Sequence, residues 1–198
     1  IYFAIPSCVP PTSSDLETTL GYIGREEVEE LSRREEIIAL GEMMDCRGVL
    51  KGESRLLEVL EEAEKQDLLI EGHIPDLSGT ELSKYLSYGI GSDHTLTFPE
   101  KMEEQISKGV AIMLQNKSIS RKNVQTLLNI SDRSNFMLVT DDIEPTLLKK
   151  GHLSINIQAA VEAGLPPLEA ITMSTARPAS YLQLKKLGAI SPGRKADF

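Results

Sequence analysis

Six short apolar runs, separated by longer segments with helical periodicity, constrain the fold of this chain more than any other feature. Each run is short enough to form a strand that is buried on both faces. A strand followed by a helix, repeated along the chain, predicts parallel strands joined by right-handed crossovers. The six runs occupy residues 1–5, 37–40, 68–70, 88–90, 110–114 and 136–139.

Two architectures are compatible with this alternation, an open doubly wound sheet and a closed (β/α)₈ barrel. The open nucleotide-binding sheet usually carries a phosphate-binding glycine motif. The sequence contains no G-x-G-x-x-G after the first run and no G-x-x-x-x-G-K-[ST]. It therefore favours an α/β fold of the TIM-barrel type, present as an incomplete barrel of about six strands.

Two of the intervening segments carry clear helix signals. Residues 78–89 are amphipathic and open with Ser78 and Glu81 in the spacing of a capping box. Residues 166–184 predict one or two further helices, broken near Pro178.

The chain is acidic, because its 21 lysines and arginines are outnumbered by 30 aspartates and glutamates, which gives a net charge of −9. Such a surface repels polyanions, so no nucleic-acid partner is expected. Residues 21–36 carry much of this charge and predict a solvated helix. No apolar run approaches the ~20 residues that span a bilayer, so no membrane segment is expected either.

The two cysteines, Cys8 and Cys46, lie far apart in the sequence and form no C-x-x-C pair. Neither a disulfide framework nor a thiolate metal cluster is therefore expected. This cysteine usage fits a reducing compartment and predicts a cytoplasmic location.

Metal-ligating residue types follow four of the six runs. Glu42, His73, His94 and Asp141 each come within a few residues of the end of an apolar run. The carboxyl ends of parallel strands meet on one face of a sheet or barrel, so these side chains are expected to converge. Carboxylates and imidazoles together bind hard or borderline divalent ions. The pattern predicts a metal site formed by these four residues.

A divalent ion in such a site lowers the pKa of bound water from ~15.7 to about 7 and so supplies hydroxide near neutral pH. This is hydrolytic chemistry. A strand-end aspartate beside the hydroxide can accept its proton and return it to a leaving nitrogen. Asp141 is the candidate for that role.

The same residues give the chain a resemblance to the adenine deaminase family of the amidohydrolase superfamily. Members of that family are metal-dependent (β/α)₈ enzymes that hydrolyse adenine to hypoxanthine and ammonia. The resemblance is carried by five motifs at strand ends, IPSCVPPT at 5–12, LGEMMD at 40–45, EGHIPDLSG at 71–79, GIGSDH at 89–94 and VTDD at 139–142.

The resemblance implies a binuclear site for Mn, Fe or Zn ions and a small-molecule purine substrate. By it, Glu42 bridges the two ions, His73 and His94 bind the second ion, and Asp141 binds the first ion and moves protons. Asp141 and His94 are thus the expected catalytic residues. It also implies a barrel domain over residues 1–186, and the start of a return into a small β domain over residues 187–198.

The chain departs from the family pattern at several places. The family's H-x-H pair does not occur in the sequence and would lie before Ile1. Thr95 stands where the family usually has Glu, and residues 143–145 are Ile-Glu-Pro in place of Arg-His-Pro. Gln115 begins the segment that replaces the family's R-E-G-S.

These departures leave two alternatives open. One is an amidohydrolase that acts on a different cyclic amide or amidine, and the other is a catalytically inactive barrel fragment. An incomplete barrel exposes open parallel strand edges, which invite pairing with another chain, so a homo-oligomer is expected.

Overall fold

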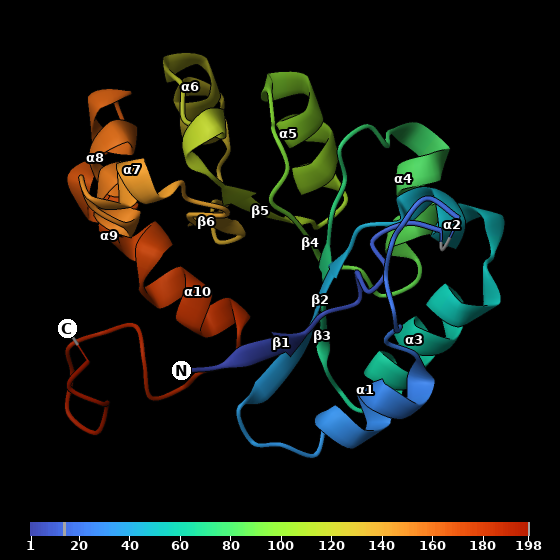
Figure 1. The fold of residues 1–198 in the computed structure, drawn as a ribbon. Helices are drawn as coiled ribbons and strands as arrows, with labels where there is room; N and C mark the ends of the chain where they lie inside the picture. The colour runs from blue at the N-terminus through green and yellow to red at the C-terminus, as the bar shows by residue number, and fades with distance from the viewer. Residues whose placement is uncertain (14, 198) are drawn as a thin grey trace. The chain divides into compact units, whose positions relative to one another are not determined.

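In the computed structural model, which describes residues 1–13 and 15–197, strands alternate with helices up to the strand at Phe136–Leu138, and the described residues after that strand form helices and turns (Figure 1). The chain divides into two compact units, Ile1–Asp93 and His94–Phe198, called here the first and second units. No helix in the described residues is long and apolar enough to cross a membrane.

The first unit is a parallel sheet with helices along one face (Figure 1). Its strands β1, β2 and β3 are hydrogen-bonded in that order, and both pairs are parallel. A single parallel bridge between Ile70 and Ile90 brings the chain beside β3 just before β4. The elements are β1 (Phe3–Ile5), α1 (Arg25–Leu31), β2 (Ile37–Met43), α2 (Cys46–Lys51), α3 (Ser54–Lys65), β3 (Leu69–Gly72), α4 (Gly79–Leu86) and β4 (Ser92–Asp93).

Apolar stripes on the helices cover this sheet. In α3 the buried residues Leu56, Val59, Leu60 and Ala63 recur at helical spacing. The buried strand residues of the sheet, such as Leu40, are less than 5% exposed. The core of the first unit is therefore built from the helix stripes and the central strands, as expected for a parallel sheet.

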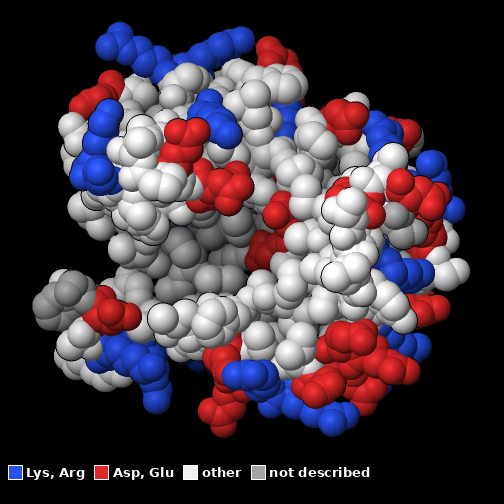
Figure 2. All heavy atoms as spheres, in the orientation of Figure 1, with Lys and Arg blue, Asp and Glu red and all other residues white. Residues whose placement is uncertain are grey.

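Helix α1 is highly charged and buries only Val28. Arg33 and Glu29 form an ion pair of 3.0 Å, with both side chains largely exposed. Figure 2 shows acidic and basic side chains intermixed in the region where Figure 1 places α1. The predicted solvated helix is therefore confirmed, although it is shorter than residues 21–36.

The second unit also contains a parallel strand pair packed against helices. Strands β5 and β6 pair in register, with Ile112 opposite Phe136. Its core includes Met102 of α5, Leu127 of α6 and Met173 of α9. The elements are α5 (Pro99–Ser107), β5 (Ala111–Leu114), the 3₁₀ helix η1 (Asn116–Ser118), α6 (Arg121–Asn129), β6 (Phe136–Leu138), α7 (Pro145–Leu148), α8 (Leu153–Glu162), α9 (Pro167–Ser174) and α10 (Ala176–Tyr181).

A carboxylate with two guanidinium partners stabilises the packing of α9 and α10. Glu169 accepts hydrogen bonds from Arg177 (2.6 Å) and Arg133 (3.2 Å) and is 20% exposed. Burial raises the pKa of Glu169, but these two arginines outweigh burial and hold the pKa below its usual value. The stabilisation is thus present above the pKa of the unfolded chain and is lost as pH falls through the lower, folded pKa.

Glu169→Gln is accordingly expected to lower the free energy of unfolding by about 1 kcal/mol at pH 7. The difference from the unsubstituted protein should shrink as the pH is lowered through the titration of Glu169, because the native carboxyl then becomes neutral too. Urea unfolding across this pH range measures it. Glu103→Gln, on the exposed side of α5, is the control and should change stability by less than about 0.5 kcal/mol at any pH.

Five of the six predicted strands are present as β1, β2, β3, β5 and β6, with bounds that agree to within three residues. The fourth differs, because the strand is Ser92–Asp93 and the run at 88–90 contributes only the bridge at Ile90. Gly89 and Gly91 flank that residue, and Gly89 has φ +85°, so the chain is still turning there. The described strands fall into two three-stranded sheets and do not close into a barrel.

Two predicted helix features are wrong in detail. Ser78 is the N-cap of α4, but its side chain makes no capping hydrogen bond, and Glu81 instead pairs with Arg47 at 3.0 Å. The helix break lies at Thr175 and not near Pro178, which is the third residue of α10. Proline is tolerated there because the first turn of a helix leaves its N–H groups without helical partners.

The predicted return into a β domain falls at the end of the described chain. Residues 187–197 contain bends and one turn but no strand, and Phe198 lies outside the described residues. The domain boundary at residue 186 stays a prediction.

Candidate metal centre

Neighbouring strands of the first unit bring Glu42 and His73 into contact. Glu42 is the second-last residue of β2, and His73 directly follows Gly72 at the end of β3. The Nδ1 atom of His73 lies 2.9 Å from Oε2 of Glu42. The two side chains are 26% and 34% exposed, so a dissolved ion can reach them.

His94 completes a group of three candidate ligands. It directly follows Asp93, so the end of β4 fixes where its backbone starts. One ligand atom from each of Glu42, His73 and His94 lies within 4.8 Å of the others. Two imidazoles and a carboxylate are the donor set of borderline divalent ions such as Zn²⁺, Mn²⁺ and Fe²⁺. The residues present therefore fit such an ion.

Buried polar side chains hold the strand ends in this region. The hydroxyl of Ser7, after β1, donates to the carbonyl oxygen of Glu42 at 2.5 Å. The N–H groups on either side of His73 donate to β4, from Gly72 to the Ser92 hydroxyl (3.1 Å) and from Ile74 to the Asp93 carboxylate (3.0 Å). The backbone around His73 is thus fixed by side chains of the strand that leads to His94.

Tyr85 of α4 is a support that the sequence reasoning missed. Its hydroxyl donates to the carbonyl of Met43 (2.6 Å) and accepts from the N–H of His73 (3.4 Å). The side chain is fully buried, and burial raises the pKa of its phenol, which therefore keeps its proton. The sequence contained one signal that could have revealed this support. Tyr85 lies on the buried face of an amphipathic segment, and a buried phenol needs a hydrogen-bond partner.

Asp141 lies in the second unit, three residues after the end of β6. Its backbone adopts φ +56°, a conformation that few residues other than glycine, asparagine and aspartate tolerate. Its carboxylate accepts hydrogen bonds from the Gln115 side chain (2.6 Å) and the Asp142 N–H (2.7 Å). Gln115 also donates to the carbonyl of His94 (2.9 Å).

The group of three ligands therefore contains Glu42, His73 and His94 and does not contain Asp141. The roles expected for Asp141, as a metal ligand and proton carrier, stay predictions. The third histidine, His152, is the N-cap residue of α8 and makes no capping hydrogen bond through its side chain.

Thr95, where the resemblance predicts glutamate, is hydrogen-bonded by a buried lysine. Thr95 accepts a hydrogen bond from the ammonium group of Lys101 at 2.6 Å, and both residues are 8% exposed. Lys101 also donates to the carbonyl of Leu96 at 3.0 Å. A hydroxyl bound to a cation thus occupies the place where the resemblance predicts a carboxylate.

Cys8 and Cys46 are both free thiols. Burial and the nearby Glu42 carboxylate raise the pKa of the Cys8 thiol. Burial and the Asp76 carboxylate do the same for Cys46, against the opposing charge of Arg47.

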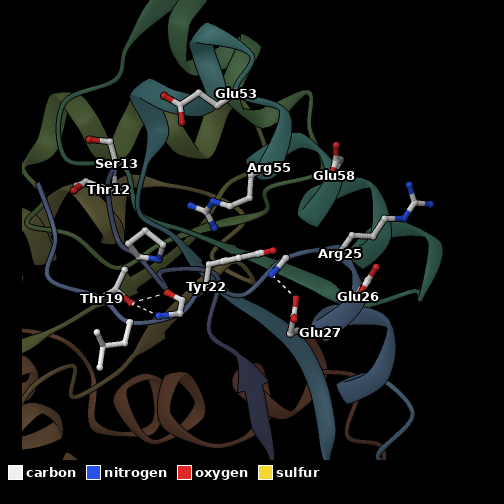
Figure 3. Close-up of a pocket in the computed structure, with 14 residues that line it drawn as sticks. Thr12, Ser13, Thr19, Tyr22, Arg25, Glu26, Glu27, Glu53, Arg55 and Glu58 are labelled. Carbon is white, nitrogen blue, oxygen red and sulfur yellow. Dashed lines mark hydrogen bonds between the residues drawn. The ribbon is translucent and has the colours of Figure 1, made fainter. Parts of the chain in front are cut away.

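A separate pocket of about 810 Å³ lies in the first unit (Figure 3). It is lined by the β1–α1 loop and by residues at the starts of α1 and α3, and none of the candidate metal ligands lines it. Several of its polar groups bind the backbone of the β1–α1 loop, as Glu27 does at the N–H of Gly24 and Thr19 does at Gly21 (Figure 3). Arg55 likewise donates to the carbonyl of Ile23.

Comparison with known proteins identifies the class. The chain belongs to the amidohydrolase family, whose model matches residues 1–198. It is 40% identical over 200 residues to adenine deaminase 2 of Oenococcus oeni and 37% identical over 199 residues to the adenine deaminase of Clostridium perfringens. Each alignment covers 100% of this chain and 35% of the relative, so the chain spans about a third of their length.

Solved structures show the same kind of fold at low sequence identity. An uncharacterized metal-dependent hydrolase from Pyrococcus furiosus matches with a TM-score of 0.53 and 14% identity, over 87% of this chain and 47% of that chain. A protein described as an amidohydrolase matches with a TM-score of 0.53 and 16% identity, over 88% of this chain and 50% of that chain.

Proposed function

We propose that this protein takes part in the metal-dependent hydrolysis of adenine to hypoxanthine and ammonia. The observation that carries the proposal is the convergence of Glu42, His73 and His94 within 4.8 Å at the ends of parallel strands. Similarity to adenine deaminases over the whole chain supports the choice of substrate. In the reaction, water adds its oxygen to C6 of the purine, and the bond from C6 to the exocyclic nitrogen breaks.

Glu42, His73 and His94 would hold a divalent ion, and a second divalent ion in the same site is part of the proposal. The chemistry supplied by a bound divalent ion is the activation of water for attack at neutral pH. The Asp141 carboxylate accepts the proton of the attacking water and delivers it to the leaving nitrogen. The Gln115 amide orients that carboxylate through its 2.6 Å hydrogen bond. Metal content measured by mass spectrometry gives the identity and number of the ions.

The architecture proposed for the complete active site is the (β/α)₈ barrel. Parallel β1-β2-β3 and β5-β6 pairings and the family assignment support it. In such a barrel the catalytic residues lie at the carboxyl ends of the strands, where Glu42, His73 and His94 are found here. Homo-oligomerisation is a further part of the proposal and is measured by light scattering.

The test is an assay of hypoxanthine formation by the complete product of the gene, loaded with Mn²⁺, Fe²⁺ or Zn²⁺. Asp141→Asn is expected to lower kcat by about 10²–10⁴-fold, the usual contribution of a positioned acid–base group. Asparagine also tolerates the positive φ of this position, so the backbone should keep its conformation.

Asp142→Asn is the matched control for this prediction. The Asp142 N–H binds the Asp141 carboxylate, and its own exposed side chain can lose its charge without breaking that bond. We expect near-normal turnover in this variant. Full turnover in Asp141→Asn would remove Asp141 from the mechanism.

A second candidate is an amidohydrolase reaction on a different cyclic amide or amidine. The Lys101–Thr95 pair favours it, because this pair changes the charge at a position where the family usually has glutamate. A panel of cyclic amides, amidines and aminopurines separates the two candidates. Turnover of another substrate without turnover of adenine would select the second.

A further inference from the structure

We propose that Tyr85 is a positioning residue, which fixes the spacing of Glu42 and His73 and thereby sets the affinity of the site for a divalent cation. The inference rests on the proposed function in taking these two side chains as metal ligands. It starts from a buried hydroxyl of α4 that is hydrogen-bonded to the ends of both strands that carry the ligands.

The backbone pairing of β2 and β3 is irregular where Glu42 lies. The strands pair at Leu40 and Ile70, and the register then shifts before Met43 pairs with Gly72. An irregularity of this kind interrupts the ladder of backbone hydrogen bonds and bends the strand. The ladder alone therefore leaves the position of Glu42 relative to β3 weakly determined.

Tyr85 connects β2 and β3 by hydrogen bonds beyond this irregularity. Its hydroxyl accepts from the N–H of His73 and donates to the carbonyl of Met43, the residue after Glu42. One oxygen atom thus joins the backbone of one candidate ligand to the neighbour of the other. The side chains of Glu42 and His73, which are 2.9 Å apart, thus belong to a residue that this hydroxyl binds and to the residue just before the other one.

The phenol can act as a rigid spacer because it is itself held by packing. Tyr85 is 0% exposed and lies on α4 one turn from Leu82, which is equally buried. Metal sites need ligand atoms placed within a few tenths of an ångström, so a small shift of β2 against β3 weakens binding. Outer-shell partners of metal ligands typically contribute about 10–100-fold in metal affinity.

The test is a calorimetric titration of the complete gene product with Mn²⁺ and with Zn²⁺, comparing the unsubstituted protein with Tyr85→Phe. Phenylalanine keeps the ring and its packing and removes only the hydroxyl. We expect the affinity to fall by about 10–100-fold, with the variant still folded. Leu82→Val is the matched control, because it loosens the packing of the same helix and has no hydrogen-bonding group to lose.

Leu82→Val should lose thermal stability and keep its metal affinity. Unchanged affinity in Tyr85→Phe would overturn the inference, and so would an equal loss in Leu82→Val, since affinity would then follow stability alone. Absence of metal binding by the unsubstituted protein would overturn it as well. Hypoxanthine formation is measured separately. A protein that binds metal in a Tyr85-dependent way without converting adenine would support this inference and contradict the proposed function.

Discussion

Replacement of Glu42 by glutamine is expected to weaken divalent-metal binding by more than about 100-fold and to lower adenine turnover by at least the same factor. Outer-shell substitutions already cost up to about 100-fold, and a direct ligand should cost more. Glutamine keeps the size of the side chain but loses its charge, and only two imidazoles of the group then remain as strong ligands. Titration calorimetry measures the affinity, and hypoxanthine formation measures turnover.

Glu36→Gln is the matched control, because Glu36 lies just before β2 and Glu42 near its end. The Glu36 carboxylate is bound by Arg34 at 2.6 Å, at the surface of the first unit. Its replacement should leave metal affinity and turnover unchanged. Undiminished metal binding by Glu42→Gln would contradict the proposed centre. An equal loss in both variants would instead indicate a disturbed β2.

Hydrophobic patterning predicts much of this fold, because buried parallel strands and amphipathic helices leave strong periodic signals. Five of the strand positions, and the placing of Glu42 and His73 at strand ends, followed from those signals. The run at 88–90 misled because a buried apolar segment need not be paired along its length, and Gly89 keeps the chain turning before β4.

The residues that support the site by hydrogen bonds could not be predicted from the sequence, for a different reason. Tyr85 and His73 are 12 residues apart, and Ser7 and Glu42 are 35 apart, so only the folded chain brings them together. Tertiary contacts also overrode a local signal at Glu81, whose carboxylate binds Arg47 and leaves the capping box unformed. Local motifs compete with such partners, and periodicity carries no information on which partner wins.

Gly72→Ala is expected to destabilise the first unit by about 1–3 kcal/mol and to weaken metal binding at the same time. A Cβ atom at this position would lie 2.7 Å from Cγ2 of Ile90, and the backbone oxygen of Ser92 would be nearer still. Backbone has no rotamer to change, so β3 and β4 must move apart. Because His73 and His94 directly follow these strands, their separation should increase. Urea unfolding and metal titration measure the two effects.

Gly21→Ala is the matched control, since a Cβ there meets no atom within 4 Å. It should leave metal affinity unchanged and alter stability by less than about 1 kcal/mol, through the unfolded chain alone. Normal stability and affinity in Gly72→Ala would contradict the close approach of the two strands. A loss of stability with full metal affinity would show that β3 and β4 can separate without moving the histidines. The expected joint loss would instead mean that the absence of a side chain at Gly72 lets two strands meet closely enough for both imidazoles to reach one ion.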